Sequence, residues 1–178
     1  MNEKETNEFF LDSTFKIIPR NLRPYKLLIL SGIPKKLKTP IMLSFVFIKY
    51  LDNISYNKIF NYLNENFKFK PYIMHSDYEK ALHLGIKENK YTQNALNIKC
   101  FFHYTQMIRK KLSSCGICKL KSNKISLEII RNIQMLCFID KNNIKKFKDI
   151  ILDKLSNIES LNLFVKYLKH YLLYKYIF

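Results

Sequence analysis

The chain has few of the features that mark secreted or membrane-spanning proteins. It contains only four cysteines in 178 residues, too few for the dense disulfide framework of a small secreted domain. Its longest apolar run extends from Ile41 to Ile48, with Ser44 inside it, whereas a bilayer-spanning helix needs ~20 residues. The N-terminus is charged and lacks the apolar core of a secretory signal. We therefore expect an intracellular protein with no membrane partner.

Acidic residues are also scarce. The sequence holds 14 Asp and Glu against 31 Lys and Arg, a formal net charge of +17. No acid occurs from Ser13 to Leu51 or from Asn89 to Leu127, and each of these stretches holds eight basic residues. Such an excess indicates a polyanionic partner, either nucleic acid or an anionic membrane surface. Codon bias in an AT-rich genome is another source of lysine, so charge alone does not identify the partner.

The order of the apolar segments predicts the fold class. Hydrophobic residues make up 48% of the chain, enough for one sizeable core, and the length suits a single domain. Three β-prone runs, at residues 8–18, 25–31 and 40–47, are joined by short connections and predict an antiparallel meander. A helix follows, with Ser55 as its expected N-cap and an end near Phe67.

After the meander, strands and helices alternate. A short strand at Pro71–Met74 leads into His75-Ser76-Asp77, a helix opens at Asp77, and a fifth strand covers 96–101. From His103 onward the spacing is helical, and three more helical segments follow, at 126–139, at 143–155 and from Leu161 to the end. This alternation predicts an α/β fold whose mixed sheet has parallel central strands and helices on its faces. In one such order the first strand is central and the fourth runs parallel beside it.

Two carboxylates are candidates for chemistry. Asp12 lies inside the first predicted strand, where a charge is costly unless it is paired or binds a metal, although a turn or strand-edge Asp gives the same pattern. Asp77 ends the fourth strand, and parallel neighbouring strands would bring both carboxylates to one sheet edge. Together with a third acid, such a pair can hold two divalent cations for phosphoryl transfer. Oxygen ligands favour Mg²⁺ or Mn²⁺.

Several sequence blocks resemble one known family. The sequence resembles the Mutator-like element (MULE) transposase domain in the order and spacing of its blocks from Phe10 to Ile117. The matching blocks are Asp12-Ser13-Thr14-Phe15-Lys16, Gly32, Pro40-Ile41-Met42-Leu43, Tyr56, Ser76-Asp77-Tyr78-Glu79-Lys80-Ala81 and Cys100-Phe101-Phe102-His103-Tyr104-Thr105-Gln106. The segments around 136–140 and 164–168 are similar to the helical insertion of that family.

The resemblance implies a fold, an activity and a site. It implies a ribonuclease-H-like core at residues 8–117, followed by an all-helical insertion at 118–178. It implies a DDE transposase that cuts DNA with activated water and then transfers the strand through a 3′-hydroxyl. Asp12 and Asp77 would be its first two catalytic and metal-binding acids, with Mg²⁺ or Mn²⁺ as cofactor. DNA is the expected partner and the nucleus the expected location; self-association is an option, and no small-molecule cofactor is expected.

One departure from the family pattern limits the expected activity. The third acid of the family is a Glu that follows an aromatic residue and an Arg-Thr-Asn-Asn segment, and the sequence contains no such segment. The acids that remain lack this context and are expected to be solvated helix charges; they are Glu128, Asp140, Asp149, Asp153 and Glu159. We therefore expect a domain truncated before its third acid. The alternatives are an inactive or domesticated DNA-binding remnant, or a helical interaction module whose charge reflects codon bias.

Cysteine and histidine residues offer two further interpretations. Cys100 and His103 are either a buried cysteine and a helix-starting histidine, or the Cys-x-x-His element of the family. With Cys115 and Cys118 they would complete a four-ligand zinc set. That set requires the intervening helix to fold back, so we do not expect zinc. His83 is expected to be an ordinary helix residue.

Overall fold

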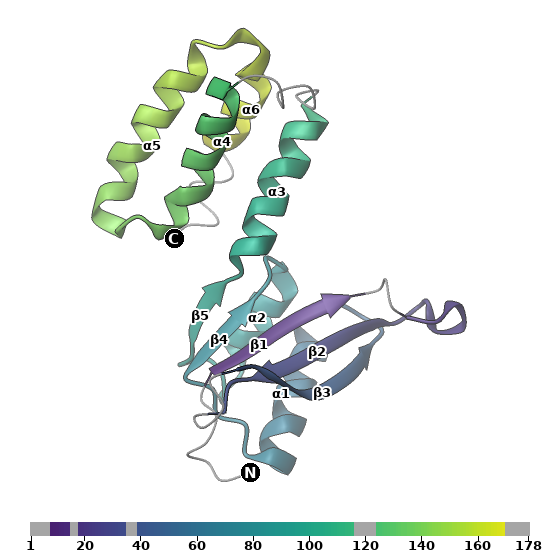
Figure 1. Ribbon diagram of the computed structural model, residues 1–178. Coiled ribbons are helices and arrows are strands. Elements are labelled where there is room, and N and C mark those ends of the chain that lie inside the picture. The colour runs from purple at the N-terminus through teal and green to yellow at the C-terminus, as the bar shows by residue number, and fades with distance from the viewer. Residues whose placement is uncertain (1–7, 15–17, 35–38, 116–123, 170–178) are drawn as a thin grey trace. The chain divides into compact units, whose positions relative to one another are not determined.

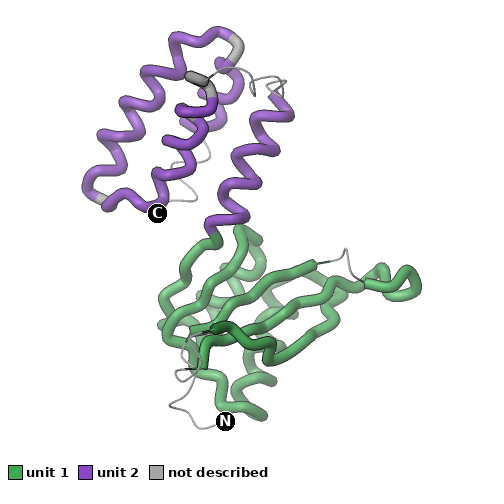
Figure 2. Tube along the Cα trace, in the orientation of Figure 1, with its two compact units in different colours: residues 1–100 green, residues 101–178 purple. Residues whose placement is uncertain are grey.

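The computed structural model describes residues 8–14, 18–34, 39–115 and 124–169. The chain divides into two compact units, residues 1–100 and residues 101–178, which are called the sheet unit and the helical unit below (Figure 2). The predicted α/β class is confirmed, because the described residues form a five-stranded mixed sheet and six α-helices. The two units are defined by packing alone, so they do not test the domain limits expected from the family resemblance.

The sheet has the order β3-β2-β1-β4-β5 (Figure 1). Its strands are β1 (Glu8–Thr14), β2 (Lys26–Gly32), β3 (Ile41–Ile48), β4 (Ile73–Ser76) and β5 (Leu96–Lys99). Strand β1 is central, antiparallel to β2 and parallel to β4, while β3 is antiparallel to β2 and β5 parallel to β4. The predicted meander and the predicted parallel neighbour of the first strand are both confirmed.

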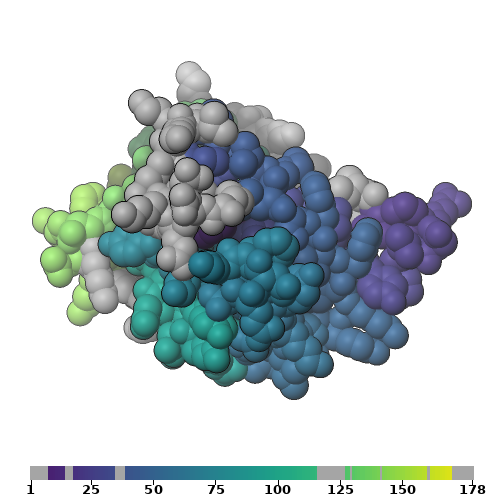
Figure 3. All heavy atoms as spheres, turned by 90° about the horizontal axis from the view of Figure 1, so that it is seen from below, coloured from purple at the N-terminus to yellow at the C-terminus, as the bar shows by residue number. Residues whose placement is uncertain are grey.

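The connection between β1 and β2 projects from the rest of the sheet unit (Figures 1 and 3). Its short 3₁₀ helix η1 spans Arg20–Leu22 and follows Pro19, whose fixed φ of −54° suits the residue that opens a turn. Arg20 and Arg23 are exposed there. The first strand was predicted to reach Ile18 but ends at Thr14; residues 15–17 lie outside the described part of the chain.

Helices α1 (Asn53–Phe67) and α2 (Lys80–Glu88) cover one face of the sheet (Figure 1). The prediction of Ser55 as the N-cap of α1 is wrong. The Asp52 carboxylate takes that role and accepts a hydrogen bond from the Ser55 N–H at 2.7 Å. An Asp at this position is as good an acceptor for the unpaired amides as a Ser, and its backbone is extended, as a cap requires. Helix α2 begins at Lys80, three residues after the predicted start at Asp77.

The core of the sheet unit lies between the sheet and these two helices. Fully buried Tyr56 and Phe60 of α1 pack with Met74 of β4 and with apolar side chains of α2, β1 and β2. The opposite face of the sheet is less covered, since β3 exposes more than half of the side chains of Phe45 and Phe47. The sheet therefore has one deeply buried face and one open face.

The helical unit contains four α-helices. They are α3 (Phe101–Ser114), α4 (Lys124–Met135), α5 (Lys141–Ser156) and α6 (Asn162–Tyr167), connected in part by the 3₁₀ turns η3 (Leu136–Phe138) and η4 (Glu159–Leu161). The prediction of helices alone after Gly116 is confirmed for the described residues of this region, whereas residues 170–178 lie outside them. Helix α3 begins at Phe101, two residues before the predicted start, because β5 already ends at Lys99. None of the described helices is long and apolar enough to cross a membrane.

Candidate functional site at the edge of strands β1 and β4

The parallel pairing of β1 with β4 brings the two candidate acids to the same level. Phe10 pairs with His75, so the two strands are aligned with an offset of 65 residues. The strand pairing ends there; continued by two residues, the same offset would place Asp12 opposite Asp77, which directly follows the last residue of β4. Both predicted acids thus lie at the carboxyl ends of adjacent parallel strands, the edge at which α/β sheets place their sites.

Alternation along β1 decides the face on which Asp12 lies. Its neighbour Leu11 is 3% exposed and belongs to the core beneath α1 and α2. Successive side chains of a strand point to opposite faces, so Asp12 belongs to the open face, and it is exposed. Its cross-strand partner on β2 is Ile29. The charge of Asp12 therefore remains in contact with water, which removes the penalty expected for a carboxylate inside a covered strand.

His75 is engaged with β1 and not with Asp77. Its imidazole Nε2 lies 2.7 Å from Oε1 of Glu8, and its ring stacks on Phe10 with centroids 4.3 Å apart. These two contacts join the His75 side chain of β4 to the Glu8 and Phe10 side chains of β1. They give His75 a structural role beside the site.

Asp77 is fixed by hydrogen bonds to both its side chain and its main chain. The backbone N–H of Glu79 donates to Oδ1 of Asp77 at 2.9 Å. Nε2 of His83, on α2, donates to the carbonyl oxygen of Asp77 at 2.9 Å. A carboxylate held by an adjacent main-chain donor is a pre-oriented ligand, because less conformational freedom is lost when it binds.

A polar network supports this position from the ends of β4 and β5. Nδ1 of His83 accepts hydrogen bonds from Nδ2 of Asn97, at 2.8 Å, and from Nζ of Lys99. The Ser76 hydroxyl in turn donates to Oδ1 of Asn97 at 2.9 Å. The ring nitrogen that accepts carries no proton, so the proton of a neutral His83 is on Nε2, which donates a hydrogen bond to the main-chain carbonyl oxygen of Asp77. The prediction that His83 is an ordinary helix residue is wrong.

Lys99 is the cation of this network. Burial lowers the pKa of Lys99 to about 8, and the Asp77 carboxylate opposes that change by favouring the charged form. Its Nζ also lies 5.9 Å from the centroid of the Tyr78 ring. Sequence patterns gave no signal for this lysine, because one basic residue among 31 has no distinguishing spacing.

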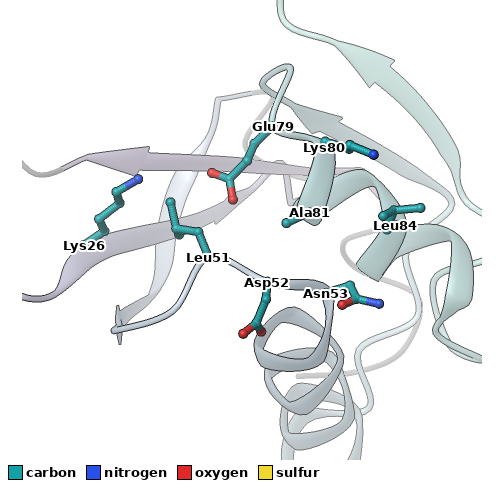
Figure 4. A pocket seen from close by; sticks show the side chains of 8 residues that line it. All are labelled: Lys26, Leu51, Asp52, Asn53, Glu79, Lys80, Ala81 and Leu84. Atoms are coloured by element: carbon teal, nitrogen blue, oxygen red, sulfur yellow. The ribbon is translucent and has the colours of Figure 1, made fainter.

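Glu79 lies close to Asp77 but its carboxylate is bound elsewhere. The Tyr56 hydroxyl, from α1, donates to its Oε1 at 3.0 Å. Burial raises the pKa of Glu79, the Tyr56 hydrogen bond opposes this, and the Asp77 charge adds to it. Glu79 lines a cavity of about 590 Å³ that is bounded by the start of β2, the β3–α1 connection and α2. Figure 4 shows its carboxylate directed toward Lys26, which also lines this cavity.

No protein-family model matches this chain, and no curated protein matches its sequence.

The Cys-x-x-His element crosses the border between the two units. Cys100 is the last residue of the sheet unit, and its N–H donates to the Ser76 carbonyl at 2.8 Å, which extends the pairing of β5 with β4. His103 lies half-buried on α3 of the helical unit. Cys115 is a free thiol, and Cys118, the remaining member of the considered zinc set, lies outside the described residues.

The donor set at the edge fits a hard divalent cation in part. Asp12 and Asp77 supply carboxylate oxygens, and Mg²⁺ is commonly bound through one or two carboxylates with water completing its shell. Within the described residues no group of three or more acidic, histidine or cysteine side chains is placed to hold a metal. Among the acids considered as a third ligand, Asp140 caps α5 through a 2.8 Å hydrogen bond from the Asn142 N–H. Glu128, Asp149, Asp153 and Glu159 are exposed in the helical unit.

Proposed function

We propose that this chain is a catalytic-domain portion of a Mutator-like DDE transposase, with a ribonuclease-H-like sheet that binds DNA and a divalent cation. The observation that carries the proposal is the β1–β4 register, whose offset of 65 residues would bring Asp12 and Asp77 to the same level if it continued past Phe10 and His75. The resemblance assigns the first two metal-binding acids to these residues.

The sheet order supports the same assignment. A central β1 with β4 parallel beside it and an antiparallel meander on its other side is the arrangement that the family resemblance requires. Helices α1 and α2 bury one face, and Asp12 is exposed on the other, where a ligand such as DNA would bind. The fold and the exposed position of Asp12 are thus consistent with one site.

Different residues of the chain would have different roles in such a site. Asp12 and Asp77 would hold Mg²⁺ or Mn²⁺, which would supply a Lewis acid to the oxygen atoms of the reacting phosphate. His83 and the Glu79 amide hold Asp77 in place. Arg20 and Arg23, on the projecting η1 connection, are exposed cations that can bind DNA phosphates.

A second candidate function is a DNA-binding remnant without strand-transfer activity. Two observations favour it. The Glu79 carboxylate accepts a hydrogen bond from Tyr56, and no third metal-binding side chain is found among the residues that the structure describes. Both candidates share the acid pair and the DNA partner. They differ in catalysis, for which two carboxylates are too few to fix two cations.

Binding of Mn²⁺ to the purified chain tests the shared part of the proposal. We expect Asp12→Asn and Asp77→Asn each to weaken Mn²⁺ binding by about tenfold or more, since even outer-shell changes commonly cost that much. Isothermal titration calorimetry or the electron paramagnetic resonance signal of free Mn²⁺ gives the affinity. Asp52→Asn is the matched control, because it removes the same charge from an exposed helix cap and should leave the affinity unchanged.

Equal Mn²⁺ affinity in the wild type and in both Asp12→Asn and Asp77→Asn would rule out the metal site. If Asp52→Asn weakened binding as much as these two, the effect would be one of net charge. Circular dichroism of each variant, matched to the wild type, excludes unfolding as the cause of lost binding.

A further inference from the structure

Two phenylalanines of β3 lie exposed on the open face of the sheet. Phe45 is 56% exposed and Phe47 is 53% exposed, and because they are two residues apart in one strand they point to the same side. Val46, between them, packs against the core on the opposite side. Exposed apolar side chains that gather at one place mark a surface that another molecule binds.

The strand register places Phe45 in line with Asp12. Asp12 pairs with Ile29 on β2, and Ile29 pairs with Phe45 on β3, so the three residues form one row across the open face. Neighbouring strands lie about 4.8 Å apart, so the main chain at Phe45 is about 10 Å from that at Asp12. A molecule that stacks on this ring would therefore lie beside the candidate metal site.

The chain around these rings is basic. No acid occurs from Ser13 to Leu51, the stretch that contains β2 and β3. Lys49 is exposed two residues after Phe47, and its Nζ lies 5.3 Å from the centroid of the exposed Tyr50 ring. Aromatic rings and ammonium groups therefore occur together at this end of β3.

The η1 connection brings two more cations to the same end of the sheet. Arg20 and Arg23 are exposed on this connection. The connection enters β2 at Lys26, which pairs with Ile48, the last residue of β3. The end of β3 that carries the rings is thus the end at which the arginines meet the sheet.

Single-stranded DNA matches both the rings and the cations. Its phosphates bind lysine and arginine, and its unpaired bases stack on aromatic side chains. The bases of a duplex are paired and stacked on one another, so a duplex can use the cations but not the rings. A second copy of the chain carries the same net charge of +17 and would be repelled by a basic surface.

We propose that the open face at β3 binds single-stranded DNA, with bases stacked on Phe45 and Phe47 and phosphates bound by Arg20, Arg23 and Lys49. This inference rests on the proposed function, because that function supplies DNA as the partner. It adds that the strand is unpaired where it passes the row of Asp12. The two rings position the strand and take no part in the chemistry.

Fluorescence anisotropy of the full chain with labelled DNA tests this inference. The probes are a thymidine oligonucleotide of about 20 nucleotides and a duplex of the same length. Phe45→Leu and Phe47→Leu remove a ring and keep an apolar side chain. We expect each to weaken binding of the single strand about fivefold or more and to leave the affinity for the duplex within about twofold. Phe45→Met and Phe47→Met provide ring-free alternatives should the Leu variants fail to fold.

Two further variants serve as controls. Phe45→Tyr keeps a ring and should bind the single strand within about twofold of the wild type. Phe67→Leu makes the same change at a ring of α1 that is 64% exposed, and it should leave both affinities unchanged. Circular dichroism of each variant, matched to the wild type, excludes unfolding as the cause of lost binding.

The outcomes distinguish this inference from the function on which it rests. If the ring-free variants bind the single strand as the wild type does, base stacking is refuted and DNA binding stands. An equal loss for single strand and duplex, or an equal loss in Phe67→Leu, also refutes the role of this face. If no DNA binds, the proposed function and the inference both fall. If the ring-free variants instead convert a dimer to a monomer in sedimentation, with unchanged DNA affinity, the face binds a second copy and the inference is wrong.

Discussion

At the scale of single residues, the acids of the sheet unit differ in what holds them. Asp52 is exposed and accepts a hydrogen bond from an amide, Glu79 is half-buried and accepts one from a phenol, and Asp77 accepts one from the amide of Glu79. Burial and the neighbouring Glu79 carboxylate raise the pKa of the Tyr56 phenol, which therefore stays a hydrogen-bond donor at neutral pH. These three carboxylates thus have three different roles: Asp52 caps a helix, Glu79 bonds to a core tyrosine, and Asp77 belongs to the candidate site.

Asp52 predicts how acid affects the stability of the sheet unit. The hydrogen bond from the Ser55 amide lowers the pKa of Asp52 below its ordinary value of 3.8, so the folded state favours the carboxylate. This contribution is present above the unfolded pKa and is lost as pH falls through the folded one. We expect Asp52→Asn, which keeps an acceptor at the cap, to show a smaller drop in melting temperature between neutral pH and about pH 3. Melting curves recorded by circular dichroism measure this drop.

Asp52→Ala is the companion variant for this experiment. It removes the cap at every pH and should lower the melting temperature at neutral pH as well as in acid. An acid-induced drop in Asp52→Asn as large as that of the wild type would show that other carboxylates dominate the acid response.

At the scale of the elements, the close approach of α1 and α2 depends on a glycine. A Cβ added to Gly85 would lie 2.7 Å from Cβ of Tyr56, nearer than such atoms approach in proteins. Neither atom is at the end of a flexible side chain, so relief requires one helix to shift. The two helices are the cover of the buried sheet face, which makes this contact important for the whole core.

Gly85→Ala is therefore expected to destabilise the chain. Overpacking costs about 1–3 kcal/mol, and the better helix propensity of Ala returns up to ~1 kcal/mol, so the net loss should be about 1–2 kcal/mol. Urea denaturation gives the free energy of unfolding. Lys87→Ala, on an exposed position of the same helix, should change it by less than ~0.5 kcal/mol. A Gly85→Ala chain as stable as the wild type would mean that α1 and α2 can separate freely.

The elements also show what sequence patterns can and cannot predict. Apolar alternation and punctuation by Pro and Gly indicated all five strands, because those signals reflect burial along a single segment. The cap at Asp52 was missed since Asp and Ser are equally good caps and both stand at the start of α1. The network of His83, Asn97 and Lys99 was missed because its members come from α2 and β5 and meet only through strand pairing. Spacing in sequence carries no signal for such a contact.

At the scale of the whole molecule, positive charge is present in both units. The sheet unit holds 16 basic and nine acidic residues, a net charge of +7, and the helical unit holds 15 and five, a net charge of +10. The excess therefore does not come from one basic tail. It provides a cationic surface of the kind that binds the DNA backbone through its phosphates, whatever the base sequence.

DNA binding by the full chain should accordingly be steeply salt-dependent. The affinity for a duplex should fall about a hundredfold or more between about 50 and about 200 mM salt, which corresponds to about four or more phosphate contacts. Fluorescence anisotropy with two unrelated duplexes of equal length measures both the salt dependence and the sequence preference. The two duplexes should bind alike. If the affinity hardly changes with salt, the positive charge does not drive DNA binding, and codon bias is then the better explanation of the many lysines.

The pairing of β1 with β4 also has a consequence for how the protein folds. It joins segments 65 residues apart in the chain, compared with 23 between β4 and β5, so it carries the larger loop-closure entropy and should form late. Asp12 and Asp77 meet only once this pairing is complete, and a slip by one residue would send Asp77 to the other face. A divalent cation that needs both carboxylates would bind only the correctly paired chain and stabilise it by mass action. Metal binding by the two acids would then indicate that the sheet is complete. The rate of metal uptake during refolding would follow the rate of β1–β4 pairing, the slowest step in forming the sheet.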